Sequence, residues 1–321
     1  MPELAERAYF LLCLALGRLL RSGKYSKARI VYEDSERRVR KRRLFYAPLL
    51  VGMGGPLMRL LDTGVRVLPQ RDWEERERRI YGSLHGTSIR IDVDGTLVLP
   101  CLAGETLAAL LEDPELEESV RKSVIEQAVV ALAEFHRLGF THGDAMAENV
   151  MVDLEAGVAH WFDFETIHES RRPIAWRRAD DVRALLVTCL LRTVAEQRAE
   201  TLHLILDVYQ DEGVTRLLAA SFISVFRRPL TFHLAQAGLS FQCFREIARL
   251  LSERLGRVDA LRRTVEGSGG RANNRLREAC SGPARRANVE KRLVDLQLHQ
   301  DELRVTLDPV DAGIEQRPGR L

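Results

Sequence analysis

Four polar residues able to do chemistry lie close together in the stretch FTHGDAMAENVMVDLEAGVAHWFDFE, residues 140–165. They are His142, Asp144, Asn149 and Asp163. Much of the sequence around them is apolar, and burying polar acids costs free energy unless something binds them. The stretch therefore predicts a binding or catalytic site.

Phosphoryl transfer fits this set of side chains. The reaction needs a group that orients an acceptor hydroxyl and oxygen ligands that hold Mg²⁺ against nucleotide phosphates. A carboxylate and an amide carbonyl suit this hard cation, so we assign Asp163 and Asn149 as metal ligands. Asp144 stands five residues before Asn149 and is then available to accept the hydroxyl proton. We assign His142 a supporting, orienting role.

The elements that would position these residues are a long helix and a short hairpin. Apolar residues at positions 120, 124, 125, 129, 132 and 135 mark one face of an amphipathic helix. Residues 149–165 read as two short strands joined at EAG, which places the acids on loops between the helix and the hairpin. Further helices are expected in RRADDVRALLVTCLLRTVAEQ, ETLHLILDVYQDEG and VTRLLAASFISVFRR, and near 239–265.

The first 105 residues read as a small sheet with one helix. A hairpin is expected over residues 28–46, and two further strands flank the turn DG at 94–95. The segment RDWEERERRIYGSLHG predicts a helix that stops at Gly86. The segment before it contains three glycines in four positions and is expected to end in a turn. The fold class is therefore α+β, with a small β-rich part followed by a helical part.

The motif HGDAMAEN matches the pattern His-x-Asp-x-x-x-x-Asn, and FDFE places a second acid fourteen residues after Asn149. With the short hairpin between them, this arrangement resembles the protein-kinase-like superfamily over roughly residues 28–250. The resemblance implies a two-lobed fold with a β-rich N-lobe and a helical C-lobe. It also implies ATP and Mg²⁺ as cofactors.

The resemblance implies a lysine on the third strand that contacts the α and β phosphates. Lys41 is the only lysine between residues 28 and 121, so elimination nominates it; the alternative is a solvated strand charge. Its expected partner is Glu77 on the following helix, with Glu74 and Glu75 as weaker candidates and a plain surface charge as the alternative.

Two other segments can be aligned with the superfamily. VLPCLAGETLAALL resembles the hinge between lobes, where backbone groups would meet an adenine edge at Pro100, Cys101, Leu102 and Ala103. RADDVRALL is similar to the helix whose aspartate braces the backbone of the catalytic loop, and Asp181 fits that role best.

The departures from protein kinases point in one direction. No GxGxxG precedes Lys41 and no Ala-Pro-Glu follows the acids. Gly143 replaces the arginine of His-Arg-Asp, Met146 stands where a lysine is usual, and Glu165 stands where Asp-Phe-Gly has its glycine. The chain thus resembles the atypical and small-molecule branches, which include aminoglycoside and choline kinases. RIO-type and lipopolysaccharide-core (Kdo) kinases are the most similar.

Composition limits location and partners. A formal charge of +2 over 321 residues does not favour a nucleic-acid partner, and five scattered cysteines without a CxxC pair favour a reducing cytoplasm. No run is long enough to span a bilayer. The apolar segment 8–20 is expected either to pack on the core or to lie on an anionic membrane, so peripheral contact through residues 8–28 at its inner face is one expectation.

The expected organisation is an N-terminal helix and basic segment over 1–27, the N-lobe over 28–104, the C-lobe over 105–266 and a polar tail over 267–321. The expected activity is transfer of the γ-phosphate of ATP to a hydroxyl of a lipid-linked, sugar-linked or protein acceptor. Three alternatives remain: a pseudokinase scaffold, a nucleotidyl transferase on the same fold, and a Ser/Thr protein kinase.

Overall fold

The structure is a computed structural model that describes residues 5–12, 26–33, 36–45, 47, 63–223 and 238–256. The chain divides into two compact units, Met1–Gly256 and Arg257–Leu321. Every described residue belongs to the first unit. The polar tail expected over 267–321 lies outside the described residues.

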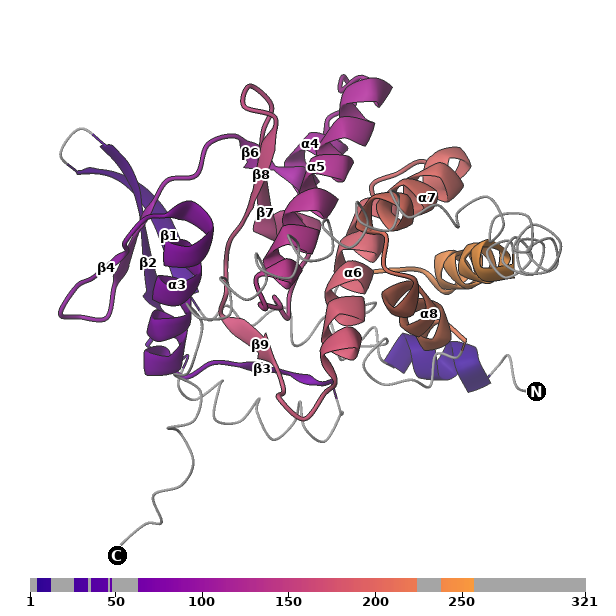
Figure 1. The fold of residues 1–321 in the computed structure, drawn as a ribbon, viewed down its shortest axis with the longest axis horizontal. Helices are drawn as coiled ribbons and strands as arrows, with labels where there is room; N and C mark the ends of the chain where they lie inside the picture. The colour runs from indigo at the N-terminus through magenta and orange to yellow at the C-terminus, as the bar shows by residue number, and fades with distance from the viewer. Residues whose placement is uncertain are drawn as a thin grey trace, which may run out of the picture. The chain divides into compact units, whose positions relative to one another are not determined.

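The fold is mixed α+β, as expected (Figure 1). Its largest sheet is antiparallel with the strand order β1-β2-β5-β4. These strands are β1 (Ser26–Glu33), β2 (Glu36–Arg43), β5 (Leu97–Pro100) and β4 (Arg90–Ile91). The hairpin expected over 28–46 and the two strands flanking the DG turn are confirmed.

The register of this sheet separates its side chains into two faces. Ala28 pairs with Lys41, and Val39 pairs with Leu99. Side chains alternate along a strand, so these four residues share one face. The intervening residues, such as Arg40, lie on the other face.

Helix α3 (Gln70–His85) packs its apolar stripe into the core. Trp73, Ile80 and Tyr81 are buried on that stripe. The helix ends at Gly86, which is left-handed with φ 59° and whose N–H bonds to the carbonyl of Tyr81. Glycine adopts this conformation without the steric cost of a Cβ, so the expected helix stop is confirmed.

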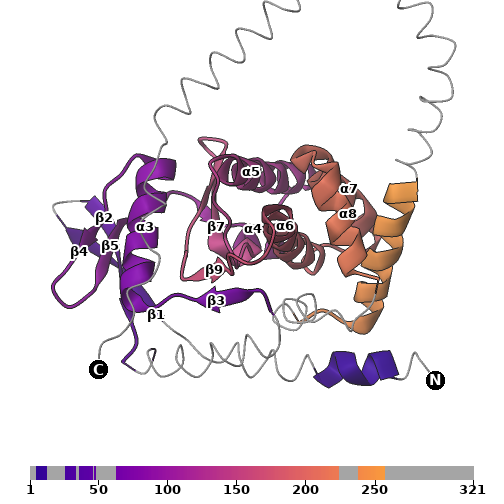
Figure 2. The same ribbon diagram turned by 60° about the horizontal axis from the view of Figure 1, so that its bottom comes forward.

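The segment before α3 contains a short strand that the sequence did not predict. β3 (Val65–Val67) pairs antiparallel with β9 (Thr166–His168), which follows the FDFE motif. Figures 1 and 2 both show the two strands side by side. This long-range pair ties the chain entering α3 to the segment that carries the second acid.

The remaining elements are mostly helical. They comprise β6 (Glu105–Thr106), α4 (Leu107–Glu112), α5 (Glu118–Arg137), η1 (Ala147–Asn149), β7 (Val150–Asp153), β8 (Val158–Trp161), α6 (Ile174–Leu190), η2 (Ala195–Gln197), α7 (Arg198–Tyr209), α8 (Glu212–Ser221) and helical residues 241–256. β6, β7 and β8 form a three-stranded sheet. The expected long helix and the hairpin at EAG are confirmed.

Helix α6 is the centre of the helical part. Every residue from Ala179 to Leu190 is buried, and a helix buried all round belongs inside a core. It contacts α4, α5, α7 and α8, and Figure 2 shows it among them. A helix held from so many sides makes a rigid support for any loop that hydrogen-bonds to it.

Residues 5–12 form a helix that packs on the core mainly through Phe10. Phe10 is 1% exposed, and its ring centroid lies 5.6 Å from that of Phe241 and 6.0 Å from that of Phe244. Leu11 and Leu12, in contrast, are 63% and 57% exposed. Residues 13–25, which the expected membrane contact includes, lie outside the described residues. Within the described ranges, no helix combines the length and apolarity needed to cross a membrane.

Candidate active site

The loop from α5 to η1 carries His142 and Asp144, and η1 ends at Asn149. Gly143 within this loop has φ 86°. A Cβ built on Gly143 would lie 3.2 Å from the backbone nitrogen of Ile167 in β9. Close packing and a left-handed backbone therefore both favour glycine where the protein-kinase motif has arginine.

Asp144 and Asn149 are directly bonded. The Asn149 side-chain nitrogen Nδ2 donates to the Asp144 carbonyl oxygen at 2.8 Å and to its carboxylate oxygen Oδ2 at 3.2 Å. The amide nitrogen is thus committed to Asp144. The amide oxygen of Asn149 is the atom left to face a cation.

The β7–β8 hairpin brings Asp163 near Asn149. Val150 pairs with Trp161, and the N–H of Phe162 donates to the carbonyl of Asn149 at 3.0 Å. Asp163 is the next residue along the chain, and its φ of 67° is left-handed, a region in which aspartate is enriched among non-glycine residues. The hairpin register therefore places both predicted metal ligands at one end of the hairpin.

Lys41 joins this end of the hairpin from β2. Its ammonium nitrogen lies 2.6 Å from a carboxylate oxygen of Asp163, 3.0 Å from one of Glu165 and 3.5 Å from one of Glu77. Lys41 is 6% exposed, so the interpretation of a solvated strand charge is wrong. One cation is held by three carboxylates from two separate parts of the chain.

Glu77 on α3 is the expected partner, and the structure selects it over its neighbours. It is 0% exposed, and its Oε1 accepts from the indole N–H of Trp73 at 2.9 Å and from the N–H of Phe164 at 3.3 Å. Glu74 bonds instead to Gln70, and Glu75 pairs with Arg78. The plain surface-charge interpretation of Glu77 is wrong.

The pKa values of this cluster follow from burial and mutual charge. Burial acts to lower the pKa of Lys41, but the charges of Asp163, Glu77 and Glu165 outweigh it and raise the pKa. Burial raises the pKa of Glu77 despite the opposing effect of Lys41. For Asp163, burial acts upward, but Lys41 lowers the pKa overall. Lys41 thus remains charged and keeps Asp163 ionised.

A cavity of about 460 Å³ opens beside the cluster. Its apolar wall comes from the sheet and from the hairpin and includes Ala28, Ile30, Val39, Leu99, Met151 and Phe162. Lys41 and Asp163 form its charged end. Pro100, Cys101 and Leu102 line it as well, whereas Ala103 is not among its lining residues. The volume lies within the range of small-molecule sites.

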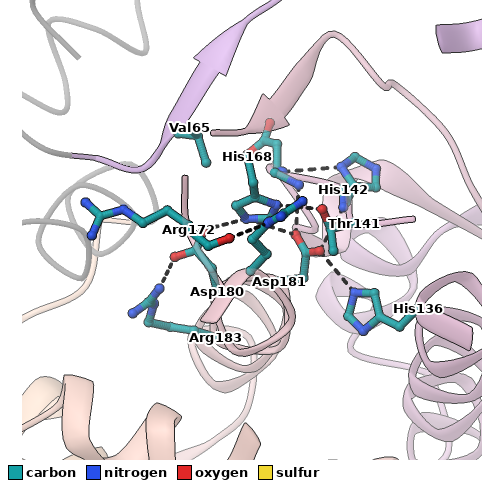
Figure 3. A network of polar contacts seen from close by, with 12 residues as sticks. Val65, His136, Thr141, His142, His168, Arg172, Asp180, Asp181 and Arg183 are labelled. Carbon is teal, nitrogen blue, oxygen red and sulfur yellow. Dashed lines mark hydrogen bonds and ion pairs between the residues drawn. The ribbon is translucent and has the colours of Figure 1, made fainter. Parts of the chain in front are cut away.

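Asp181 on α6 braces the loop, as expected (Figure 3). Its carboxylate accepts from the backbone N–H of His142 at 2.7 Å and of Gly143 at 2.8 Å. It also accepts from Nε2 of His136 at 3.0 Å. Burial acts to raise the pKa of Asp181, but electrostatic interaction with His168 and hydrogen bonding to His136 lower it overall. The loop that carries His142 and Asp144 is therefore held by an ionised carboxylate on the central helix.

His142 links the two acid-bearing segments. Its Nε2–H donates to the carbonyl of Phe162 at 3.0 Å, and its Nδ1 accepts from the N–H of Asp144 at 3.3 Å. Burial lowers the pKa of His142 to about 4, so the neutral ring serves both bonds at neutral pH. His142 touches backbone on either side, which makes it a positioning residue.

Three contacts of the site were not predicted. The Glu165–Lys41 ion pair is the first, although Glu165 was conspicuous in the sequence as a replaced glycine. The second is the guanidinium of Arg76, which donates to the carbonyl of Thr141 at 2.5 Å. The third is a buried pair next to the brace, in which His168 bonds to Asp180 at 3.1 Å. No local sequence pattern signals the last two, because each joins distant segments.

The donor set can be tested against Mg²⁺. Among the residues that the structure describes, no group of three or more His, Cys, Asp or Glu side chains is arranged to hold a metal ion by itself. Magnesium usually takes one or two protein carboxylates and completes its shell with waters and substrate phosphates. The carboxylate of Asp163, with 36% of its side chain exposed, and the amide oxygen of Asn149 fit that pattern.

Comparison with known proteins leaves the family open. The sequence matches no protein-family model and no curated protein.

Proposed function

We propose that the chain is an ATP- and Mg²⁺-dependent phosphotransferase with a two-lobed, protein-kinase-like fold. In this proposal the four-stranded sheet with α3 forms the N-lobe, and the helical part with the β7–β8 hairpin forms the C-lobe. ATP occupies the cavity between β2, β5 and the hairpin. Its adenine lies against the backbone of Pro100–Leu102, and its phosphates lie at Lys41.

One observation carries the proposal. Lys41, Glu77 and Asp163 come from β2, from α3 and from the segment after β8, yet they meet at one end of the cavity. A lysine held by a helix glutamate beside a metal-binding aspartate is the phosphate-gripping arrangement of kinases. Buried ion pairs cost desolvation free energy. A role in binding phosphates would explain why this costly ion pair is present.

In this proposal each residue of the site has a separate role in phosphoryl transfer. Lys41 binds the α and β phosphates, and Glu77 positions it. Asn149 and Asp163 would hold Mg²⁺, which would supply charge neutralisation at the transferred group. Asp144 accepts the proton of the acceptor hydroxyl while the hydroxyl oxygen bonds to the γ-phosphorus, the bridging bond breaks and ADP leaves. Positioning and electrostatics then supply most of the rate enhancement.

For the acceptor we propose a lipid- or sugar-linked hydroxyl, and for the location the cytoplasm at the inner face of the membrane. The exposed Leu11 and Leu12 of the N-terminal helix support contact with an apolar phase. A Ser/Thr protein acceptor has no comparable support, since Met146 replaces the usual lysine. A screen of hydroxyl-bearing lipids and sugars as phosphate acceptors tests this part of the proposal.

A catalytically weak scaffold is the second candidate, and the Glu165–Lys41 contact favours it. Lys41 already has three carboxylate partners. Phosphates must compete with Glu165 and Asp163 for the ammonium group. A protein that binds nucleotide without turnover would have the same geometry.

The first test is a thermal shift with ATP and Mg²⁺ on the wild type, Asp163→Ala and the control Glu155→Ala, whose side chain is exposed in the hairpin turn. We expect an upward shift of several degrees in wild type and Glu155→Ala and none in Asp163→Ala. No shift in any of them would refute the nucleotide site.

Turnover separates the candidates. In the phosphotransferase, Asp144→Ala removes activity and keeps ATP binding. A wild type that binds ATP but turns over none of the screened acceptors would favour the scaffold. The mass of the modified acceptor distinguishes added phosphate from an added nucleotide, and the latter would indicate a nucleotidyl transferase.

A further inference from the structure

A second hollow lies on the outer face of the four-stranded sheet, away from the 460 Å³ cavity. Its volume is about 300 Å³. We call it the outer-face cavity, and it is lined by Lys27, Arg29, Arg40, Arg42, Arg43, Leu44, Asp94 and Thr96. Lys27 and Arg29 alternate along β1 with Ala28, which lines the other cavity, so the two hollows lie on opposite faces of the sheet.

The strand register places like charges opposite each other in this hollow. Lys27 pairs with Arg42, and Arg29 pairs with Arg40. Like charges directly opposite across an antiparallel pair are destabilising. Two successive pairs of this kind on one face carry an electrostatic cost that an anion between them would relieve.

The carboxylates nearby neutralise only part of this charge. Arg40 is paired with Glu33 at 3.2 Å and with Asp92 at 2.5 Å. Arg42 contacts Asp94 at 3.4 Å, with 64% and 42% of their side chains exposed, so this ion pair is weak. For Lys27 and Arg29 the structure records no ion pair among the described residues. A surplus of positive charge therefore faces a concave surface.

We propose that the outer-face cavity binds a phosphate group, with Lys27 and Arg29 as its principal contacts. Guanidinium and ammonium groups form short, charge-assisted hydrogen bonds with phosphate oxygens. The phosphate belongs either to an anionic lipid headgroup or to a soluble phosphate compound. This site is independent of the proposed kinase activity, because Lys41 and the nucleotide cavity lie on the other face of the sheet.

The test uses the full chain and the double variant Lys27→Gln/Arg29→Gln. The matched control is Arg71→Gln/Arg78→Gln, which removes the same charge from two exposed positions on α3. Equilibrium dialysis with radiolabelled inorganic pyrophosphate is done in EDTA, so that no Mg²⁺-dependent binding contributes.

We expect the association constant to fall by about tenfold in Lys27→Gln/Arg29→Gln, because two charge-assisted contacts are lost. In the control we expect a change of less than about twofold, because distant exposed charges are screened. Equal binding by wild type and both variants, or no binding by the wild type, would overturn the proposal. Thermal unfolding of both variants checks that they remain folded.

Flotation on vesicles identifies the source of the phosphate. Vesicles of phosphatidylcholine alone are compared with vesicles that also contain about one third phosphatidylglycerol. Retention by the anionic vesicles that is lost in Lys27→Gln/Arg29→Gln assigns a lipid headgroup. Pyrophosphate binding without flotation assigns a soluble phosphate compound.

Discussion

Lys41 shows how charge is balanced at single residues. Its ammonium group faces three carboxylates, of which Glu77 is fully buried and Glu165 nearly so. Removing one partner from a buried ion pair costs far more than the intact pair contributes, because the remaining charges stay buried. The stability of the site therefore depends on the cation more than on any one acid.

Lys41→Met is expected to lower the free energy of unfolding at pH 7 by about 3–5 kcal/mol. The loss should shrink as the pH falls. Burial already raises the pKa of Glu77, and without Lys41 the pKa of Glu77 should rise further. The folded variant then binds a proton at Glu77 more tightly than the unfolded chain does. Its free energy of unfolding therefore falls as the pH rises above about 4.3. Urea unfolding at pH 5 and pH 8 measures this. The exposed Lys122→Met is the control, and an equal loss in both variants would contradict the expectation.

Glu165→Gln tests the competition for Lys41. Replacing one of the three carboxylates leaves Lys41 more available to phosphates, so within the proposed function the affinity for ATP with Mg²⁺ should rise by about threefold, a fraction of the effect of one charged hydrogen bond. Isothermal titration measures the change. Weaker binding would instead indicate that Glu165 helps to hold the metal or the nucleotide.

Asp181→Asn tests how Asp181 braces the loop that carries His142 and Asp144. An amide has one acceptor oxygen in place of two, so one of the backbone N–H groups of His142 and Gly143 loses its partner, at a cost of about 2–3 kcal/mol. The pKa of Asp181 is lowered in the folded state. Its stabilisation is therefore present above the unfolded pKa of about 3.9 and is lost as the pH falls below it.

Denaturant unfolding at pH 7 and pH 3 checks this prediction. The difference between wild type and Asp181→Asn should narrow at pH 3. If the difference in the free energy of unfolding is the same at both pH values, the carboxylate of Asp181 contributes through its shape and not through its charge.

Among the elements, β9 and the loop that carries His142 and Asp144 are in close contact. Gly143 lets β9 pass over the loop, and β9 pairs with β3, which leads into α3. Strand β9 thereby links the loop that carries Asp144, the segment that carries Asp163, and helix α3, which carries Glu77. A side chain on Gly143 would force that strand outward.

Gly143→Ala is expected to destabilise the protein by about 2–4 kcal/mol, from an unfavourable φ and a steric contact together. Gly139→Ala is the matched control. Gly139 has nearly the same φ, 85°, but a Cβ placed on it would have nothing within 4 Å, so only about 1 kcal/mol is expected. Thermal unfolding compares the two variants. An equal loss of stability in both variants would show that β9 moves to accommodate the added methyl group without a cost in free energy.

For the whole molecule, the main consequence is that the 460 Å³ cavity is built from two parts of the fold. The sheet contributes β1, β2 and β5, and the helical part contributes the β7–β8 hairpin. A ligand in this cavity contacts both the sheet and the hairpin. Its binding should therefore reduce the local motion of the sheet and the hairpin together.

Hydrogen exchange with and without ATP and Mg²⁺ tests this expectation. Exchange should slow in residues 26–43 and 150–163, because a ligand that binds only the folded arrangement suppresses local opening. Residues 198–221, in α7 and α8, should be unaffected. Protection confined to one of the two parts would contradict a shared cavity.

The sequence alone determined those features that depend on neighbours along the chain. Helix α3 and its stop at Gly86 follow from apolar spacing and from the freedom of glycine. The loop that joins Asp144 to Asn149 has only four residues between them, so their contact is local. Lys41 was nominated by elimination, and Glu77 was expected as its partner on the following helix from the resemblance.

Tertiary structure alone decided the contacts between distant segments. The pairing of β3 with β9, the Glu165–Lys41 contact and the exclusion of Ala103 from the cavity wall have no local signature. The like-charge pairs of the outer-face cavity exist only because β1 and β2 meet in one particular register. Short-range patterns decide which elements form, but close packing of the whole core decides which side chains meet.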